Sequence, residues 1–254
     1  IDQVPALDAV LEKQEVYYQA EDPTAEDNTP IKLRNNKFTQ LFESLTGMYG
    51  WPNYGEFDPT PILAPFFLLF FAMCMGDCGY GILLMIIGVL IAKKKLNIEM
   101  FDGLGPIITV LGVGTTVVGF FLGTFMGIDL YNAEWMPQAL KSVMIKGEVM
   151  GYDIQMVLAL CIGVFHICLA MVVKAICYTK QFGFKENIAT WGWTLLIVGG
   201  LLVAILGMTV LPAAVFKWAI IAVGTVSALA IYIFNTPGRN PLINIGAGLW
   251  DTYN

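Results

Sequence analysis

The feature that most constrains this sequence is a series of long segments that are almost free of charge. Of its 254 residues, 57% are hydrophobic and only 13% are charged. A water-soluble domain of that composition would expose more apolar surface than it could cover. Each segment has about 20 residues or more, enough for a helix to cross a hydrocarbon core of about 30 Å. The sequence therefore predicts an all-α integral membrane protein whose apolar segments are residues 61–92, 103–127, 154–177, 191–212 and 215–234.

The first of these segments is too long for one crossing and carries one formal charge, Asp77, near its middle. As a single helix it would extend about 48 Å. The glycines around Asp77 permit a turn, where the carboxylate could reach water or cap a second helix. We expect a short helical hairpin with helices at 60–76 and 78–93, and the alternative is one long tilted helix with Asp77 in a polar crevice. The turn of the hairpin would consist of Gly76, Asp77, Gly79, Tyr80 and Gly81.

Counting the hairpin as two crossings gives about six transmembrane helices. The opposite loop, residues 128–153, contains more acidic residues than lysines. By the positive-inside rule both ends of the chain are then cytoplasmic. Residues 60–238 would form the membrane domain, and residues 239–254 would be a cytoplasmic interfacial segment. The basic residues on the side of the N-terminus are Lys93, Lys94, Lys95, Lys174, Lys180, Lys185 and Arg239.

The first 59 residues differ from the rest, with eleven acidic residues against four basic ones. The acidic, proline-containing stretch 21–30 is typical of a linker, and residues 38–49 predict an amphipathic helix at the membrane interface. We interpret residues 1–59 as a cytoplasmic arm with no nucleic-acid-binding surface. Because neither end resembles a natural boundary or a signal peptide, we expect something to be missing on both sides.

Few side chains in the apolar segments can carry chemistry. Asp77 and His166, the only histidine, are ionisable groups at membrane depth and are therefore candidates for an ion pathway. Glu148, in the polar loop, is the third candidate. A neutral His166 hydrogen-bonded to a neighbouring helix is the alternative interpretation. Glycines that recur every four residues predict close helix packing in the third helix, and they are Gly119, Gly123 and Gly127.

Other chemistry is not indicated by the sequence. Cys74 and Cys78 are four residues apart, but no pair of histidines or cysteines lies nearby to complete a metal site. The glycine-rich stretch 103–114 has no preceding strand and no Lys-Ser or Lys-Thr pair, so it does not predict a phosphate-binding loop. No nucleophile motif is present. We expect no metal, no cofactor and no catalysis by this chain alone.

Three stretches of the sequence resemble a known family. They read PIKLRNNKFTQLFESLTGMYGWPNYGEFDPTP at 30–61, APFFLLFFAMCMGDCGYGILL at 64–84 and NPLINIGAGLWDTYN at 240–254. Together they are similar to the membrane half of the large a-type subunit of V-type rotary ATPases, called subunit I in prokaryotes. The resemblance covers roughly residues 29–254.

This resemblance implies a non-catalytic stator subunit of an enzyme that translocates protons or sodium ions. Members of the family have eight membrane helices, and the last two pack against a rotating ring of proteolipid c or K subunits. The implied partners are this ring, the peripheral-stalk and central-stalk cap subunits, and the lipid bilayer. The compact loops favour a prokaryotic cell membrane over a vacuolar membrane. In this family an arginine on the seventh helix separates two ion half-channels.

By this resemblance, residues 1–59 are the tail of a missing N-terminal domain, and residues 239–254 lead into missing helices, because the sequence stops at Asn254, before the helix that carries that arginine. The two arginines of the sequence, Arg34 and Arg239, fall at cytoplasmic or interfacial positions, so neither matches the family's arginine. We therefore expect these helices to brace the half-channels as a scaffold. The alternative is a self-contained secondary transporter or channel with a re-entrant hairpin at MGDCGYG. A third hypothesis is an adaptor that is only anchored by its helices.

Overall fold

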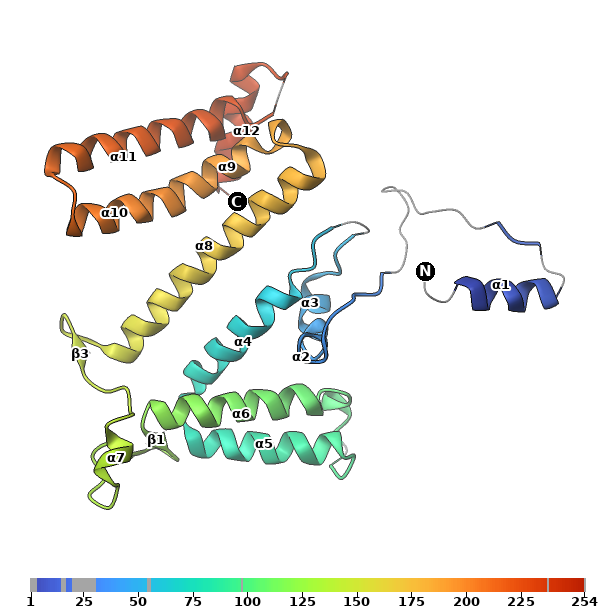
Figure 1. The fold of residues 1–254 in the computed structure, drawn as a ribbon, viewed down its shortest axis with the longest axis vertical. Coiled ribbons are helices and arrows are strands. Elements are labelled where there is room, and N and C mark those ends of the chain that lie inside the picture. Colours follow the sequence, from blue (N-terminus) through green and yellow to red (C-terminus); the bar gives the residue numbers. More distant parts are fainter. Residues whose placement is uncertain are drawn as a thin grey trace.

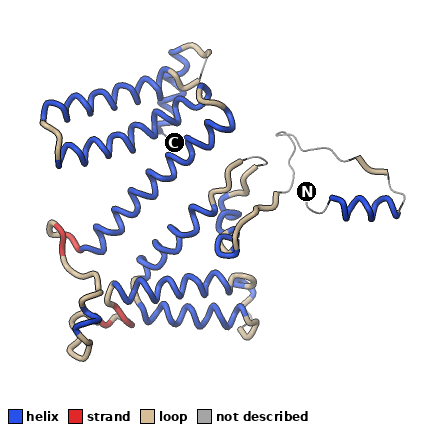
Figure 2. Tube along the Cα trace, in the orientation of Figure 1, coloured by secondary structure: helices blue, strands red, loops and turns tan. Residues whose placement is uncertain are grey.

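The computed structural model of the protein describes residues 4–14, 17–19, 31–53, 56–96, 98–236 and 238–253. Helices dominate this part of the chain, and its strands form two short hairpins (Figure 2). Helix α1 (Val4–Lys13) stands apart from the other helices (Figure 1). The expected linker at 21–30 lies outside the described residues.

Two short helices replace the single interfacial helix expected at 38–49. Helix α2 (Lys37–Gln40) begins where the Asn36 side chain accepts a hydrogen bond from the Thr39 backbone N–H at 2.8 Å. The chain turns at Leu41 and Phe42 before α3 (Glu43–Tyr49). The break places Phe42 in the interior, completely buried against Ala64, Ile107 and Leu111. Packing against the first membrane helices has therefore overridden the helical periodicity of this segment.

The apolar run at 61–92 folds as two helices, α4 (Thr60–Met75) and α5 (Cys78–Ala92), with a break between them at Gly76 and Asp77 as expected. The turn is shorter than expected, because Gly79, Tyr80 and Gly81 already lie in the first turn of α5. Pro61 lies in the first turn of α4, where its missing N–H costs no hydrogen bond. The Asp58 carboxylate accepts the Thr60 backbone N–H at 2.9 Å and satisfies one free donor of this helix end. Helix α4 then packs mainly on α6 (Gly105–Phe121), so the two arms of the hairpin diverge after the turn (Figure 1).

Helices α5 and α6 form the closest pair in the structure, and glycine makes their approach possible. A Cβ added at Gly88 would lie 2.5 Å from the Thr109 backbone nitrogen. The same backbone-to-backbone contact occurs at Gly112 against Met85. These glycines are spaced by seven residues along each helix and lie at positions 81, 88, 105, 112 and 119. The spacing of seven brings each glycine back to the same face of its helix, because two helical turns span about seven residues.

Helix α6, the third of the expected membrane helices, is shorter than the expected range 103–127. It ends at Phe121, and Gly123 and Gly127 have φ of 69° and 79°, which a right-handed helix does not allow. The expectation that these two glycines pack within a helix is therefore wrong. Only Gly119 lies in α6, where it contacts the backbone at Asp77 and Cys78. Glycine recurs every four residues from 119 to 127, but the helix ends at Phe121, so the pattern in the sequence extends beyond the helix.

A polar loop follows α6 and contains both strand hairpins. Its small core consists of Leu130, Met136 and Met144. Each two-residue hairpin turn has positive φ at both central residues, the type I′ geometry that suits strand twist. The elements of the loop are β1 (Thr124–Phe125), β2 (Ile128–Asp129), α7 (Gln138–Lys141), β3 (Glu148–Val149) and β4 (Tyr152–Asp153).

The second half of the chain consists of long apolar helices. Helix α8 (Ile154–Phe182) runs diagonally between the two halves of the molecule (Figure 1). It continues five residues beyond the expected end at 177. The following helices α9 (Ile188–Thr194) and α10 (Gly200–Thr209) are joined without a break by the π-helical turn η3 (Leu195–Gly199). The remaining elements are η1 (Glu99–Phe101), η2 (Lys185–Asn187), α11 (Ala213–Ala228), η4 (Leu229–Ile233) and α12 (Pro241–Tyr253).

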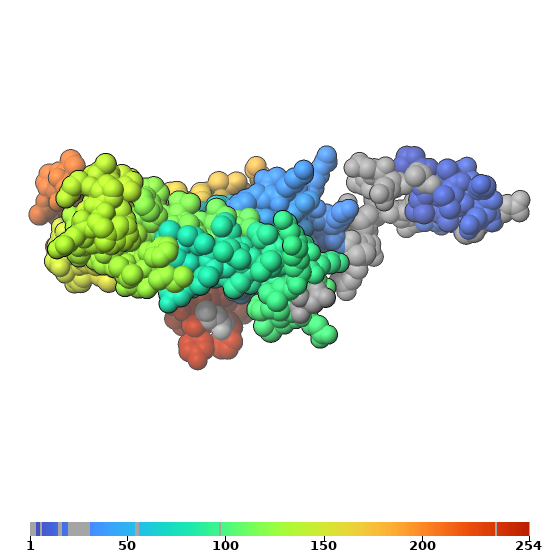
Figure 3. Space-filling view, turned by 90° about the horizontal axis from the view of Figure 1, so that it is seen from below, coloured from blue at the N-terminus to red at the C-terminus, as the bar shows by residue number. Residues whose placement is uncertain are grey.

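The segment 239–254, expected at the interface, contains a helix that folds back on its predecessor. The Asn244 side-chain amide of α12 donates to the backbone oxygens of Ile233 at 2.9 Å and Thr236 at 3.0 Å. A Cβ at Gly248 would lie 2.7 Å from the Ile231 backbone oxygen. Helix α12 is thereby held against η4, and it projects from one side of the molecule (Figure 3).

Connections between the helices lie alternately at two ends of the molecule (Figure 1). The turn at 76–77, the polar loop and the turn at 210–212 lie at one end, at the left of the view. The connections at 98–104 and 183–187 lie at the other. Among the described residues, three stretches of helix are long and apolar enough to cross a membrane: Ile154–Phe182, Lys185–Thr209 and Ala213–Ile233. Helices α4, α5 and α6 are apolar but shorter, so crossing by all six remains a prediction.

Candidate functional site

Asp77 lies where the two arms of the first hairpin meet. Gly76 ends α4 in the left-handed conformation, with φ of 57°, which glycine adopts without strain. Asp77 then returns to extended geometry and is the N-cap of α5. Its Oδ1 accepts the backbone N–H groups of Gly79 at 2.8 Å and Tyr80 at 3.1 Å. The carboxylate thus satisfies two of the free donors at the start of α5.

A second pair of donors reaches the same carboxylate from the polar loop. The backbone N–H of Met126 donates to Oδ1 and that of Gly127 donates to Oδ2, both at 2.8 Å. These residues form the β1–β2 turn, and their positive φ values of 49° and 79° aim successive N–H groups at one point. Successive N–H groups in such a turn form an anion-binding concavity. Asp77 therefore joins the hairpin turn to a loop 49 residues away, and we call this arrangement the Asp77 clamp.

The surroundings of Asp77 keep it ionised. Only 4% of the residue is exposed. Partial desolvation raises the pKa of Asp77, but the backbone N–H groups of Gly127, Tyr80, Met126 and Gly79 outweigh it and leave the pKa below its usual value. A carboxylate that accepts four backbone hydrogen bonds is suited to anchoring. This geometry favours a structural role for Asp77 over a role in proton transfer.

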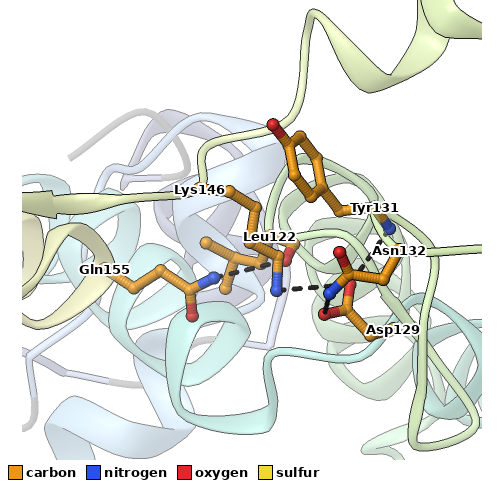
Figure 4. Close-up of polar contacts among 6 residues, drawn as sticks. All are labelled: Leu122, Asp129, Tyr131, Asn132, Lys146 and Gln155. Atoms are coloured by element: carbon orange, nitrogen blue, oxygen red, sulfur yellow. Dashed lines mark hydrogen bonds and ion pairs between the residues drawn. The ribbon is translucent and has the colours of Figure 1, made fainter.

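Polar contacts around Asp129 hold the polar loop together, and a hydrogen bond of Gln155 joins the start of α8 to the end of α6 (Figure 4). Asp129 accepts the Tyr131 backbone N–H at 3.0 Å and the Asn132 side-chain amide at 2.8 Å. Lys146 lies 3.6 Å from it, the one ion pair among the residues that the structure describes. Gln155, at the start of α8, donates to the Leu122 backbone oxygen at 3.2 Å, just after the end of α6. Desolvation raises the pKa of Asp129, but the Tyr131 N–H, Lys146 and Asn132 together lower it below its usual value.

His166 lies at the contact between α4 and α8. Its ring stacks on Phe66 with a centroid separation of 4.2 Å and an interplanar angle of 14°. Phe70, one turn further along α4, lies 6.0 Å away. The neighbours of this histidine are aromatic, and it forms no hydrogen bond or ion pair with any of the described residues. The expected hydrogen bond to a neighbouring helix is therefore absent from this part of the chain.

Glu148 is exposed in the polar loop. It faces Asp153 across the β3–β4 pair, and Asp153 caps α8 by accepting the Gln155 N–H at 2.7 Å. Two carboxylates opposite each other repel slightly, which suits a solvated position. Among the described residues, no hydrogen bond or ion pair connects Asp77, His166 and Glu148. The structure does not bring the three ion-pathway candidates together, and such a role for them remains a prediction.

Two groups of residues at this site were missed by sequence reasoning. Met126 and Gly127 supply half of the Asp77 clamp through backbone atoms, which leave no side-chain signature. Their only local signal is a glycine at the second turn position, weaker than the Asn-Gly pair typical of such turns. Asp129 and Lys146 lie 17 residues apart, and opposite charges at that distance in a polar loop do not predict a contact. Among the described residues, no cluster of histidine, cysteine and acidic side chains could hold a metal ion.

Comparison with known proteins connects this architecture to a family. The model of the V-type ATPase 116kDa subunit family matches residues 5–138, which include the Asp77 hairpin. The chain belongs to this family. The V-type ATPase 116kDa subunit resemblance inferred from the three sequence stretches is therefore confirmed.

Some relatives of this V-type ATPase 116kDa subunit family member match most of the chain, beyond the residues matched by the family model. The A-type ATP synthase subunit I of Pyrococcus abyssi is 30% identical over 250 residues, covering 93% of the chain and 36% of the relative. Subunit I of Methanocaldococcus jannaschii is 42% identical over 108 residues, which are 42% of the chain and 16% of the relative. The V-type ATP synthase subunit I 1 of Treponema pallidum is 27% identical over 224 residues, 83% of the chain and 34% of the relative. The chain spans about a third of the length of the relatives that match most of it.

Proposed function

We propose that this chain is the membrane scaffold of a stator subunit in an ion-translocating rotary ATPase. The observation that carries the proposal is its family membership together with its set of apolar helices, three of which are long enough to cross a membrane. In this role the chain catalyses no reaction itself. Its helices brace the ion half-channels beside the rotating ring, and the ion carried is a proton or sodium.

The Asp77 clamp supports a scaffold role because a stator must resist torque. One carboxylate holds the start of α5 and the β1–β2 turn together through four backbone hydrogen bonds. Glycine contacts then fix α5 against α6 at backbone distance. Closely packed elements of this kind deform little, since protein interiors have low compressibility.

The distribution of arginine also supports a scaffold rather than a complete ion path. Rotary transport requires a fixed positive charge at lipid depth, and arginine fills that role because it resists deprotonation. Arg34 and Arg239 are both exposed and lie outside the apolar helices. We infer that another part of the assembled protein supplies the charge.

The partners and the location follow from the same proposal. The partners are the proteolipid c or K ring, the peripheral-stalk and central-stalk cap subunits, and the lipid bilayer. Both ends of the chain lie on the cytoplasmic side of a prokaryotic cell membrane. The alternating connections support this topology, with the acidic polar loop at the opposite end from α3 and the N-terminal arm (Figures 1 and 3).

The alternative function is a self-contained transporter or channel with a re-entrant hairpin. Such a hairpin would place its turn inside the membrane. Instead, the turn at Asp77 binds the backbone of the polar loop at Met126 and Gly127. A turn that is held by a polar loop suits the membrane surface. There the backbone N–H and C=O groups that the short strands leave unpaired can form hydrogen bonds with water.

Ion flux in liposomes distinguishes the two functions. We expect the chain, reconstituted with the proteolipid ring, to show no proton or sodium flux above empty vesicles under an imposed potential. The complete subunit with the same ring is the positive control. A flux through the chain that disappears on changing Asp77→Asn or His166→Gln would reject the scaffold and support the channel.

A further inference from the structure

A crevice between α4 and α8 has no role in the function proposed above. Its volume is about 340 Å³, within the range of sites that hold small molecules. The crevice is partly open, and most of its lining is apolar, contributed by Pro59, Ile62, Leu63, Ala170, Val173 and Cys177. On α8 it extends from His166 to Tyr178, about 18 Å at the rise of 1.5 Å per residue.

The two ends of the crevice differ in chemistry. At one end the lining includes His166, whose ring stacks on Phe66 of α4. At the other end lie two opposite charges, Glu56 before the start of α4 and Lys174 in the second half of α8. Because α4 and α8 run in opposite directions, the start of one lies beside the end of the other (Figure 1). The crevice is thus an apolar slot with a charged mouth.

The two charged side chains at the mouth do not pair with each other. No ion pair joins Glu56 and Lys174, although both line the crevice. The Glu56 carboxylate is oriented by Asn53, which donates its backbone N–H at 2.7 Å and its side-chain amide at 3.2 Å. The Lys174 ammonium lies 5.5 Å from the centroid of the Tyr178 ring. The Glu56 carboxylate and the Lys174 ammonium are therefore both available to a ligand that carries one positive and one negative charge.

We propose that this crevice binds one phospholipid with an amine in its headgroup, such as phosphatidylethanolamine. An acyl chain fills the apolar slot down to His166, the lipid phosphate pairs with Lys174, and the headgroup ammonium donates to Glu56. The charges at the mouth support this occupant, because a zwitterionic headgroup carries one group for the Glu56 carboxylate and one for the Lys174 ammonium. A purely anionic headgroup would face the Glu56 carboxylate.

Native mass spectrometry of the full chain in its assembled complex tests the proposal. The protein is purified in mild detergent and exposed to equal amounts of phosphatidylethanolamine, phosphatidylglycerol and phosphatidylcholine with identical acyl chains. We expect one retained lipid per subunit, enriched in phosphatidylethanolamine over phosphatidylcholine by about fivefold or more, since a charge-assisted hydrogen bond is lost with choline. Absence of a retained lipid, or retention without preference, would overturn the proposal.

Variants at the slot and at the mouth make separate predictions. Ala170→Phe adds a ring to an exposed position of the lining, so it should abolish lipid retention. Cys161→Phe adds the same ring on α8 outside the crevice and should leave retention unchanged.

The charged mouth is tested separately. Lys174→Gln should reduce retention of all three lipids, and Glu56→Gln should remove only the preference for ethanolamine. Lys180→Gln and Glu186→Gln are exposed controls outside the lining. If Ala170→Phe retained lipid as the parent does, or if another segment of the assembled protein were found in the slot, the lipid site would be rejected.

Discussion

At the scale of single residues, the role of Asp77 depends on how many donors surround it. Its sequence context, a lone acid among glycines in an apolar run, predicts a turn, a helix cap or an ion-pathway group. The structure adds two donors from the β1–β2 turn to the two of the helix cap. A buried acceptor with four backbone partners is costly to remove, because each donor is then left unsatisfied. His166, by contrast, contacts aromatic rings, and its surroundings give it no comparable anchor.

Replacement of Asp77 should destabilise the fold strongly. We expect Asp77→Ala to lower the free energy of unfolding by about 3 kcal/mol, since four backbone N–H groups lose a charged acceptor. Asp77→Asn should have a smaller effect, because its remaining oxygen can still serve Gly79, Tyr80 and Met126. Thermal unfolding in detergent measures both variants. The matched control is Asp153→Ala, which removes an N-cap that accepts the Gln155 N–H and should cost about 1 kcal/mol. Equal effects of Asp77→Ala and Asp153→Ala would contradict the clamp.

The pH dependence of stability should report the same carboxylate. The folded pKa of Asp77 lies below its unfolded value, which is about 3.9. The stabilisation is therefore present above the unfolded pKa and is lost as the pH falls through the folded pKa. The unfolding temperature should fall on acidification below about pH 4, and this loss should be smaller in Asp77→Asn. Asp129 also has a lowered pKa, so Asp129→Asn serves as the comparison. An unchanged acid profile in Asp77→Asn would show that this group is not responsible.

At the scale of elements, the pairing of α5 and α6 shows how small residues replace hydrophobic attraction inside a membrane. Lipid tails are as apolar as leucine, so helices associate there through close packing. Glycines at a spacing of seven let the backbones of α5 and α6 approach directly. The sequence interpretation chose the spacing of four in 119–127 instead, and two of those three glycines belong to turns. Glycine identity alone does not distinguish a helix contact from a positive φ.

A single methyl group should separate this helix pair. We expect Gly112→Ala to destabilise the protein by about 1–3 kcal/mol, because the new Cβ would meet the Met85 backbone, which cannot rotate away. Thermal unfolding of the purified protein measures the change. Gly224→Ala is the control in α11, where nothing lies within 4 Å of the added Cβ and helix propensity favours alanine. A Gly112→Ala variant as stable as Gly224→Ala would mean that α5 and α6 are further apart than described.

At the scale of the whole molecule, the connections sort into two groups at opposite ends (Figure 1). The polar loop, held by the Asp77 clamp and the Asp129 contacts, lies at one of them. The other end has the connection that begins after α5 with Lys93, Lys94 and Lys95, and the connection at 183–187. This arrangement is what six crossings with both ends in the cytoplasm require, and it assigns an expected side to every loop.

Chemical labelling should reveal that arrangement. In a cysteine-free background, Met150→Cys in the β3–β4 turn should react with an impermeant maleimide added outside intact cells. Met100→Cys in η1 should react only after the membrane is opened. Both positions are well exposed, at 94% and 74%, so a difference in labelling reports sidedness rather than burial. Labelling of both positions from the same side would reject six crossings.

Patterns within about 30 consecutive residues were enough to predict most of the apolar helices, the break at Gly76 and Asp77 and the family, although not every helix end. Packing between distant segments, which those patterns do not contain, makes α4 leave α5 to pack on α6 and breaks the interfacial helix to bury Phe42. It also lets the Asp77 carboxylate hold a turn 49 residues away. The charged mouth of the crevice likewise unites Glu56 and Lys174, 118 residues apart. The physical reason is that propensity and hydrophobicity act locally, whereas the partner of a buried donor, acceptor or ring is chosen by packing across the whole chain.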